Sequence, residues 1–150
     1  MPAATYVIVS RVLSSSGQPL AVQYNPPKDV PSPLTLAIYD PLKVPGNQKI
    51  RVNAKGTTFS PIGITDKAAA PDKAFKLVVG GDTKPPVLDI WVAHKEVPAE
   101  PKGTVYIQLN DKAQKGVWGA TNDPSVDTQI IYGEYKKEVW QSWSLIQVPG

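Results

Sequence analysis

The chain has 150 residues, with 16 Lys or Arg, 13 Asp or Glu and a formal net charge of +3. It contains no Cys, which excludes disulfide bonds, thiol catalysis and Cys-ligated metal. The cationic residues are scattered, and the most prominent pair, Lys136-Lys137, is flanked by Glu134 and Glu138. This distribution favours a solvated surface, and we expect no nucleic-acid partner.

Proline and glycine interrupt the sequence throughout, with 16 Pro and 11 Gly residues. Few uninterrupted runs remain, so long helices are excluded and the composition predicts an all-β protein in a single domain, residues 1–150. The N-terminus lacks a secretory leader pattern, and no apolar run approaches the length of a membrane span. We expect a cytoplasmic location, with leaderless release as an alternative, and no membrane partner.

In chain order, the first predicted strand covers Tyr6 to Val12, where β-branched and aromatic residues alternate. A turn at Ser14 to Gly17 leads into a second strand from Pro19 to Val22. The next segment, Tyr24 to Pro33, carries four prolines in ten residues. Because each proline removes a ladder donor, this segment is predicted to be a stiff, projecting loop.

The rest of the chain continues with short strands separated by turn residues. A third strand from Leu34 to Tyr39 and a fourth through Ile50 and Val52 complete a first unit of four. The strands predicted for the later units are Phe59 to Ile64, Ala74 to Val79, Val87 to His94, Val105 to Leu109, Val117 to Ala120, Thr128 to Tyr132 and Trp143 to Val148.

Two short motifs recur along the chain. The pattern Gln-x-apolar-x-apolar occurs from Gln48 to Val52 and in the last strand, with a weaker copy at Asp89 to Ala93, at intervals of about forty and fifty residues. Aromatic strand starts at Tyr6, Phe59 and Tyr106 recur at a similar interval. We therefore predict three repeats, 1–54, 55–98 and 99–150, each of four strands, which together describe a β-trefoil.

Three fourfold repeats that close on strands such as Trp140-Gln141-Ser142-Trp143 resemble the ricin-B-type β-trefoil. The Cys-free, Pro-rich chain of this length resembles the mushroom β-trefoil protease inhibitors, nearest the cospin- and cnispin-type serine protease inhibitors. The clitocypin and macrocypin cysteine protease inhibitors are related in fold. The resemblance implies a six-stranded barrel capped by three hairpins, from which variable loops project.

In trypsin-directed members of that family, a basic residue on the loop between the second and third strands enters the protease. The resemblance therefore implies a protease-binding loop made of Asn25, Pro26, Pro27, Lys28, Asp29 and Val30, with Lys28 as the anchor. Flanking prolines hold such a backbone extended before binding. Asp29 counts against this assignment because an acidic neighbour is unfavourable there, and Lys67, followed by Ala68, is the reserve site.

Chemistry other than inhibition has little support in the sequence. His94 is the only His, no Gly-x-Ser-x-Gly element accompanies it, and no acidic cluster completes a metal site. We expect a protein that is not an enzyme, with no catalytic residue, no cofactor and no metal. It is expected to be a monomer whose partners are trypsin-like serine proteases.

Two other functions remain open. A cysteine protease inhibitor, directed at papain-like enzymes or legumain, would use the loops Leu13 to Pro19 and Asp40 to Asn47. A ricin-B-like lectin would pair an acidic residue with a stacking aromatic residue, as Asp40 with Tyr39 or Asn110-Asp111 with Trp118. No such set recurs three times, and the four Trp are more simply interpreted as core residues.

Overall fold

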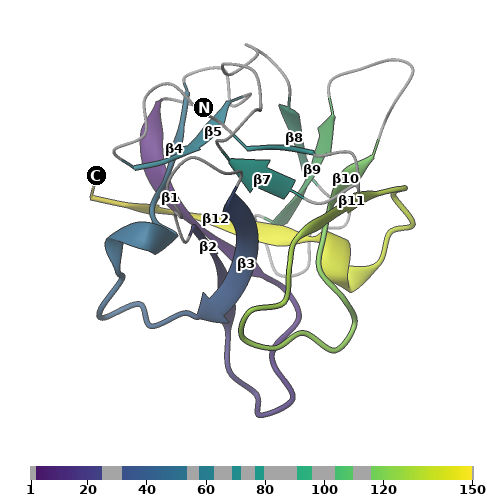
Figure 1. The fold of residues 1–150 in the computed structure, drawn as a ribbon, viewed down its shortest axis with the longest axis horizontal. Coiled ribbons are helices and arrows are strands. Elements are labelled where there is room, and N and C mark those ends of the chain that lie inside the picture. Colours follow the sequence, from purple (N-terminus) through teal and green to yellow (C-terminus); the bar gives the residue numbers. More distant parts are fainter. Residues whose placement is uncertain are drawn as a thin grey trace.

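The computed structural model describes residues 3–24, 32–53, 58–62, 69–71, 77–79, 91–95, 104–109 and 116–149. These residues form twelve strands and two short 3-10 helices (Figure 1). The strands are β1 (Ala4–Ser10), β2 (Leu20–Tyr24), β3 (Ser32–Ile38), β4 (Ile50–Val52), β5 (Phe59–Pro61), β6 (Ala70–Pro71), β7 (Leu77–Val79), β8 (Trp91–Lys95), β9 (Thr104–Leu109), β10 (Val117–Gly119), β11 (Ile131–Gly133) and β12 (Trp143–Val148). The helices are η1 (Gly46–Gln48) and η2 (Val139–Gln141). In this part of the chain no helix is long and apolar enough to cross a membrane.

Six strands form a curled antiparallel ladder in the order β5-β4-β1-β12-β9-β8. The two ends of the chain meet in its middle, where β1 pairs with β12 over its length, from Thr5 with Val148 to Ser10 with Trp143. The other edge of β1 pairs with β4, where Tyr6 lies opposite Ile50. The ladder therefore joins the first and last strands of the sequence, as the predicted barrel requires.

The remaining strands form three hairpins, β2–β3, β6–β7 and β10–β11. The first hairpin contacts the second through the pairing of Ser32 with Val79. It contacts the third through the backbone of residues 127–130, since Leu36 N donates to Thr128 O at 2.9 Å and Ile130 N donates to Leu34 O at 2.9 Å. A six-stranded ladder with one hairpin in contact with the two others fits the architecture expected of a β-trefoil, and the predicted all-β class is confirmed. The repeat boundaries stay a prediction.

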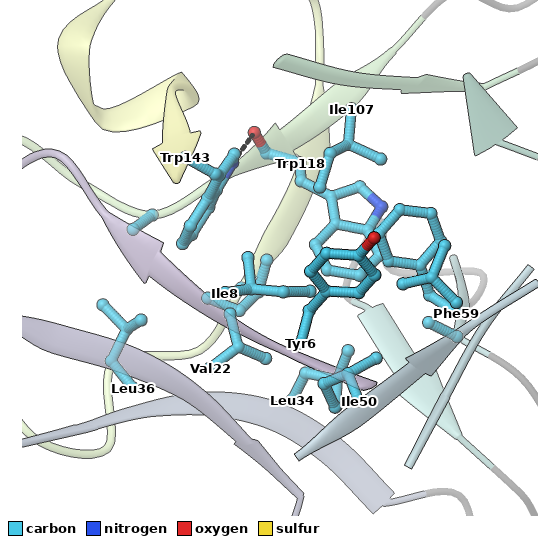
Figure 2. Close-up of a cluster of buried hydrophobic side chains, with 14 of the residues drawn as sticks. Tyr6, Ile8, Val22, Leu34, Leu36, Ile50, Phe59, Ile107, Trp118 and Trp143 are labelled. Atoms are coloured by element: carbon cyan, nitrogen blue, oxygen red, sulfur yellow. Dashed lines mark hydrogen bonds between the residues drawn. The ribbon is translucent and has the colours of Figure 1, made fainter. Parts of the chain in front are cut away.

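The main core fills the space between the six-stranded ladder and the hairpins (Figure 2). Trp118 and Trp143 are fully buried in it, and the indole Nε1 of Trp143 donates to the Trp118 carbonyl oxygen at 3.2 Å. Phe59 packs on Trp118 with ring centroids 5.3 Å apart and a tilt of 57°. Tyr6 of β1 belongs to the same cluster, so aromatic residues from all three parts of the chain meet in it. Trp140, by contrast, is only partly buried.

The proline-rich segment is shorter than the sequence predicts, because Pro33 lies within β3 and pairs with Val78 of β7. The pairing of β3 with β2 ends at Leu34 and Tyr24, so Pro33 lies beyond the reach of β2. Among the described residues Pro33 has no partner in β2, so its missing N–H breaks no β2–β3 hydrogen bond of the described ladder. A proline is tolerated at such an edge position.

The aromatic strand starts are not all equivalent. Tyr6 is buried in the main core, whereas in β9 the core residues are Val105 and Ile107. Tyr106 points the other way, is only partly buried and stacks on Tyr135, with ring centroids 4.1 Å apart. Since side chains alternate along a strand, a shift of one residue moves a side chain to the opposite face. The alignment of Tyr106 with Tyr6 is therefore wrong by one position.

Candidate functional site

The predicted protease-binding residues, Asn25, Pro26, Pro27, Lys28, Asp29 and Val30, lie outside the described residues, as does the reserve residue Lys67. The described structure defines only the strand ends on either side of the loop. Tyr24 ends β2, and Ser32 begins β3 and pairs with β7. The start of β3 therefore lies beside the second hairpin.

At the opposite end of β2 and β3, two loops lie on one side of the molecule, the lower side in Figure 1. The loop between β1 and β2, residues 11–19, folds around Ser14. Ser14 N donates to Gln18 O at 2.9 Å, Gly17 N donates to Ser14 O at 2.8 Å, and Gln18 N donates to Ser14 Oγ at 3.1 Å. Gly17 has a φ of +80°, which glycine adopts at no steric cost. The loop is a braced turn rather than a loose linker.

The loop between β3 and β4 contains a second braced turn, Asp40 to Lys43. Lys43 N donates to Asp40 O at 3.1 Å, and Leu42 N donates to the Asp40 carboxylate at 2.9 Å. This is the hydrogen-bonding pattern of an Asx turn followed by Pro, which fixes φ at Pro41. Leu42, at the tip, is 94% exposed.

Both sides of this turn are anchored in a small second cluster on the outer face of the barrel. Tyr39 and Val44 pack there against Val7, Val9 and Ala21. Tyr39 N donates to Pro19 O at 2.9 Å, which ties the turn to the end of the first loop. The two loops are therefore held together as one surface.

A third ordered loop, residues 134–138, precedes η2. It wraps around the buried carboxamide of Gln141, whose Oε1 accepts from Lys136 N at 2.8 Å and whose Nε2 donates to Glu134 O at 2.7 Å. Lys136 and Lys137 are both exposed, which confirms the interpretation of this charged pair as solvated surface. Lys137 has a φ of 57°, the left-handed region that non-glycine residues seldom adopt.

The sugar-binding alternatives have weak support in the geometry. Trp118 is fully buried in the core, as its interpretation as a core residue predicts, so it is not free to stack on a sugar as the lectin alternative requires. Its suggested partners, Asn110 and Asp111, lie outside the described residues. Tyr39 packs on the second cluster, and its neighbour Asp40 already accepts a backbone hydrogen bond within the turn. In the described ranges, no three His, Asp or Glu side chains gather to hold a metal ion.

Sequence reasoning missed Leu42. The signal was present as Asp-Pro-Leu-Lys, a turn sequence with an apolar residue at its third position. Apolar residues in turns are common enough that the sequence alone gave no reason to single this one out. Its exposure became informative only once the two flanking anchors, Tyr39 and Val44, were seen.

No protein-family model matches the chain, and no curated protein matches it in sequence. Solved structures do match. A proteinase inhibitor from Coprinopsis cinerea superposes with a TM-score of 0.67 and 13% sequence identity, covering 99% of both chains. The Macrolepiota procera ricin B-like lectin, solved with lactose, gives a TM-score of 0.67 and 15% identity, covering 99% of this chain and 98% of the lectin.

A designed protein with threefold symmetry, ThreeFoil, also matches, with a TM-score of 0.62, 17% identity and 96% of this chain covered. At these identities the likeness establishes the fold alone. It does confirm the relation in fold to a fungal β-trefoil protease inhibitor that the sequence predicted. The chain is a β-trefoil, similar in structure to both a proteinase inhibitor and a lectin.

Proposed function

We propose that this protein acts by binding, as a proteinaceous inhibitor of trypsin-like serine proteases. The observation that carries the proposal is the superposition of the whole fold on the Coprinopsis cinerea proteinase inhibitor, which covers 99% of each chain. The proline-rich sequence around Lys28 supplies the anchor in this proposal, because a long cation held by a stiff backbone suits a deep pocket that ends in a carboxylate.

The anchor is tested by replacing Lys28. Lys28→Ala should weaken trypsin inhibition roughly thirtyfold to several-thousandfold, because the pocket carboxylate is left buried without a partner, at a cost of about 2 to 5 kcal/mol. Lys28→Arg should keep the activity, and Lys28→Leu should shift it toward chymotrypsin. Inhibition constants from progress curves measure each effect.

Two further variants control this experiment. Asp29→Ala should tighten binding slightly by removing an acidic neighbour, and Lys67→Ala should be silent. If Lys67→Ala abolishes inhibition while Lys28→Ala leaves it intact, the anchor belongs to the second repeat and the assignment to Lys28 is wrong.

A second candidate function is inhibition of papain-like cysteine proteases through the β1–β2 and β3–β4 loops. The observation that favours it is the bracing of both loops, which lowers the entropy lost when they dock. Sugar binding ranks below both, because Trp118, one of the two aromatic residues named for stacking, is in the core. A glycan array should therefore show no binding, and a confirmed ligand there would reverse this order.

A further inference from the structure

The loop between β11 and η2 carries Lys136-Lys137, the only two adjacent basic residues in the sequence. Both side chains are exposed. Exposed loops are the segments that proteases cut most readily, and trypsin-like enzymes cut after a basic residue. By sequence and exposure, residues 134–138 therefore offer a cleavage site to the class of enzyme that the protein is proposed to inhibit.

The backbone of this loop is bent around one buried side chain. Gln141 is 1% exposed, and its Oε1 accepts from Lys136 N at 2.8 Å and from Glu138 N at 3.3 Å. Its Nε2 donates to Glu134 O at 2.7 Å. Lys137 lies between the two N–H groups that meet at Oε1, and its φ of 57° turns both toward this one oxygen atom. A single carboxamide thus sets the conformation of the loop.

Further contacts hold the loop on both sides of the lysine pair. On one side, Tyr135 stacks on Tyr106 of β9, with ring centroids 4.1 Å apart and planes 17° apart. On the other side, η2 begins, and Gln141 N donates to Glu138 O at 2.9 Å. The lysine side chains are therefore open to solvent while the backbone that carries them is fixed.

This backbone conformation is unsuited to cleavage. A protease binds the residues around the scissile bond as an extended strand that pairs with the enzyme through main-chain hydrogen bonds. An extended strand has a φ of about −120 to −140°, whereas Lys137 has a φ of 57°. The Lys136 N–H group is also already bonded to Gln141. Cleavage therefore requires the loop to leave Gln141 and the left-handed residue to become extended.

We infer that the lysine pair is a closed cleavage site, which Gln141 and the left-handed Lys137 hold in a form that trypsin-like proteases do not hydrolyse. Hydrolysis would add one water molecule across the peptide bond after Lys136 or Lys137, leaving a new carboxylate and a new amine. The shorter product would contain β12, which pairs with both β1 and β9 and carries the buried Trp143. The closed loop thus protects a central strand of the barrel, whether or not the protein inhibits a protease.

Two substitutions at Lys137 separate backbone conformation from charge. Lys137→Asn and Lys137→Val remove the same exposed cation, and both keep Lys136 as a cleavable residue. Asn adopts a positive φ more readily than a β-branched residue does. Trypsin should therefore cut Lys137→Val after Lys136 roughly tenfold faster than it cuts Lys137→Asn, because the loop of the Val variant is open for more of the time. Mass spectrometry of the first products identifies the bond.

A second measurement removes the carboxamide itself. Gln141→Ala should be cut after Lys136 and Lys137 roughly tenfold faster than the intact protein, or more, since the open loop is then more populated. The matched control Gln48→Ala makes the same change in the first unit, where the carboxamide bonds Ile38 O, and should leave cleavage at the lysine pair unchanged. A synthetic peptide of residues 133–139 gives the rate for the same bonds without the barrel.

Trypsin is used in molar excess, and its free activity is followed on a small chromogenic substrate. Inhibition then does not hide cleavage, and a protein that fails to inhibit trypsin still tests the closed loop. If the intact protein is cut after Lys136 or Lys137 as fast as the peptide, the inference is wrong. Equal cleavage rates for Lys137→Asn and Lys137→Val would also overturn it, because the conformation of residue 137 would then not control cleavage.

Discussion

The first and third parts of the chain close with the same sequence motif, but the Gln side chain of the motif makes different hydrogen bonds in the two parts. In each, a 3-10 helix ends on a buried Gln, and an apolar residue two positions later enters the core: Gln48 with Ile50, and Gln141 with Trp143. Gln141 contacts three backbone groups of the loop before it, at Glu134, Lys136 and Glu138. The Gln48 side chain donates one hydrogen bond, to Ile38 O, and within the described ranges its buried Oε1 has no hydrogen-bond donor.

The hydrogen bonds of Gln48 and Gln141 indicate the structural role of the closing motif. In both places the buried carboxamide bonds backbone groups outside its 3-10 helix, and the residue two positions later enters the core. The third part uses every atom of the carboxamide to organise its own loop, whereas the first part uses one bond to reach β3. We therefore expect the closing segment of the third part to contribute more to stability.

The largest expected effect is at Trp143. Trp143→Ala should lower the free energy of unfolding by about 3 to 5 kcal/mol, because a fully buried indole is lost and a cavity is left. The Trp118 carbonyl also loses its hydrogen-bond donor. Denaturant midpoints with unchanged m-values measure the loss. The counterpart Ile50→Val should cost about 0.5 to 1.5 kcal/mol. A loss under about half a kcal/mol for Trp143→Ala would remove this residue from the core and break the repeat alignment.

A smaller effect, and a sharper comparison, comes from the two glutamines. Gln141→Ala should cost about 2 to 3 kcal/mol, since two backbone N–H groups and one carbonyl lose their partner. Gln48→Ala removes one bond and should cost about 1 kcal/mol. Hydrogen exchange of the Lys136 amide should accelerate in Gln141→Ala alone. Equal losses in the two variants would mean that the additional bonds of Gln141 add nothing to stability.

The smallest expected change in stability comes from replacing two glycines, Gly116 and Gly46, by alanine. A Cβ at Gly116 would meet the Tyr132 ring at 2.3 Å, and Gly116 N also donates to the Tyr132 hydroxyl at 3.0 Å. Gly116→Ala should therefore cost about 1 to 3 kcal/mol by forcing the ring aside. Gly46, in η1, has open space around it, so Gly46→Ala should be neutral or stabilise by about half a kcal/mol. The thermal midpoints of the two variants measure this difference in stability. An unchanged midpoint for Gly116→Ala would show that the Tyr132 ring moves aside freely.

Much of the fold was predictable because its signals are local. Breakers and short alternating runs predicted eleven of the strands and missed β6, and the recurring Gln motif predicted that Ile50 and Trp143 play matching roles. The candidate site was harder to predict from the sequence. The sequence singled out Lys28 by its prolines, and that prediction stays untested, while Leu42 carried no distinguishing pattern until the contacts of Tyr39 and Val44 were known.

By itself, the sequence determined the all-β class, most of the strands and the motif that closes the first and last units, since propensity, turn residues and periodicity act over a few neighbours. Only the tertiary structure decided that Tyr106 points away from the core, that Pro33 joins a strand, and that Trp118 is buried while Trp140 is only partly so. Each of these depends on a partner strand or side chain distant in sequence. Side-chain direction follows strand register, and register is set by pairing between distant segments, which local sequence does not specify.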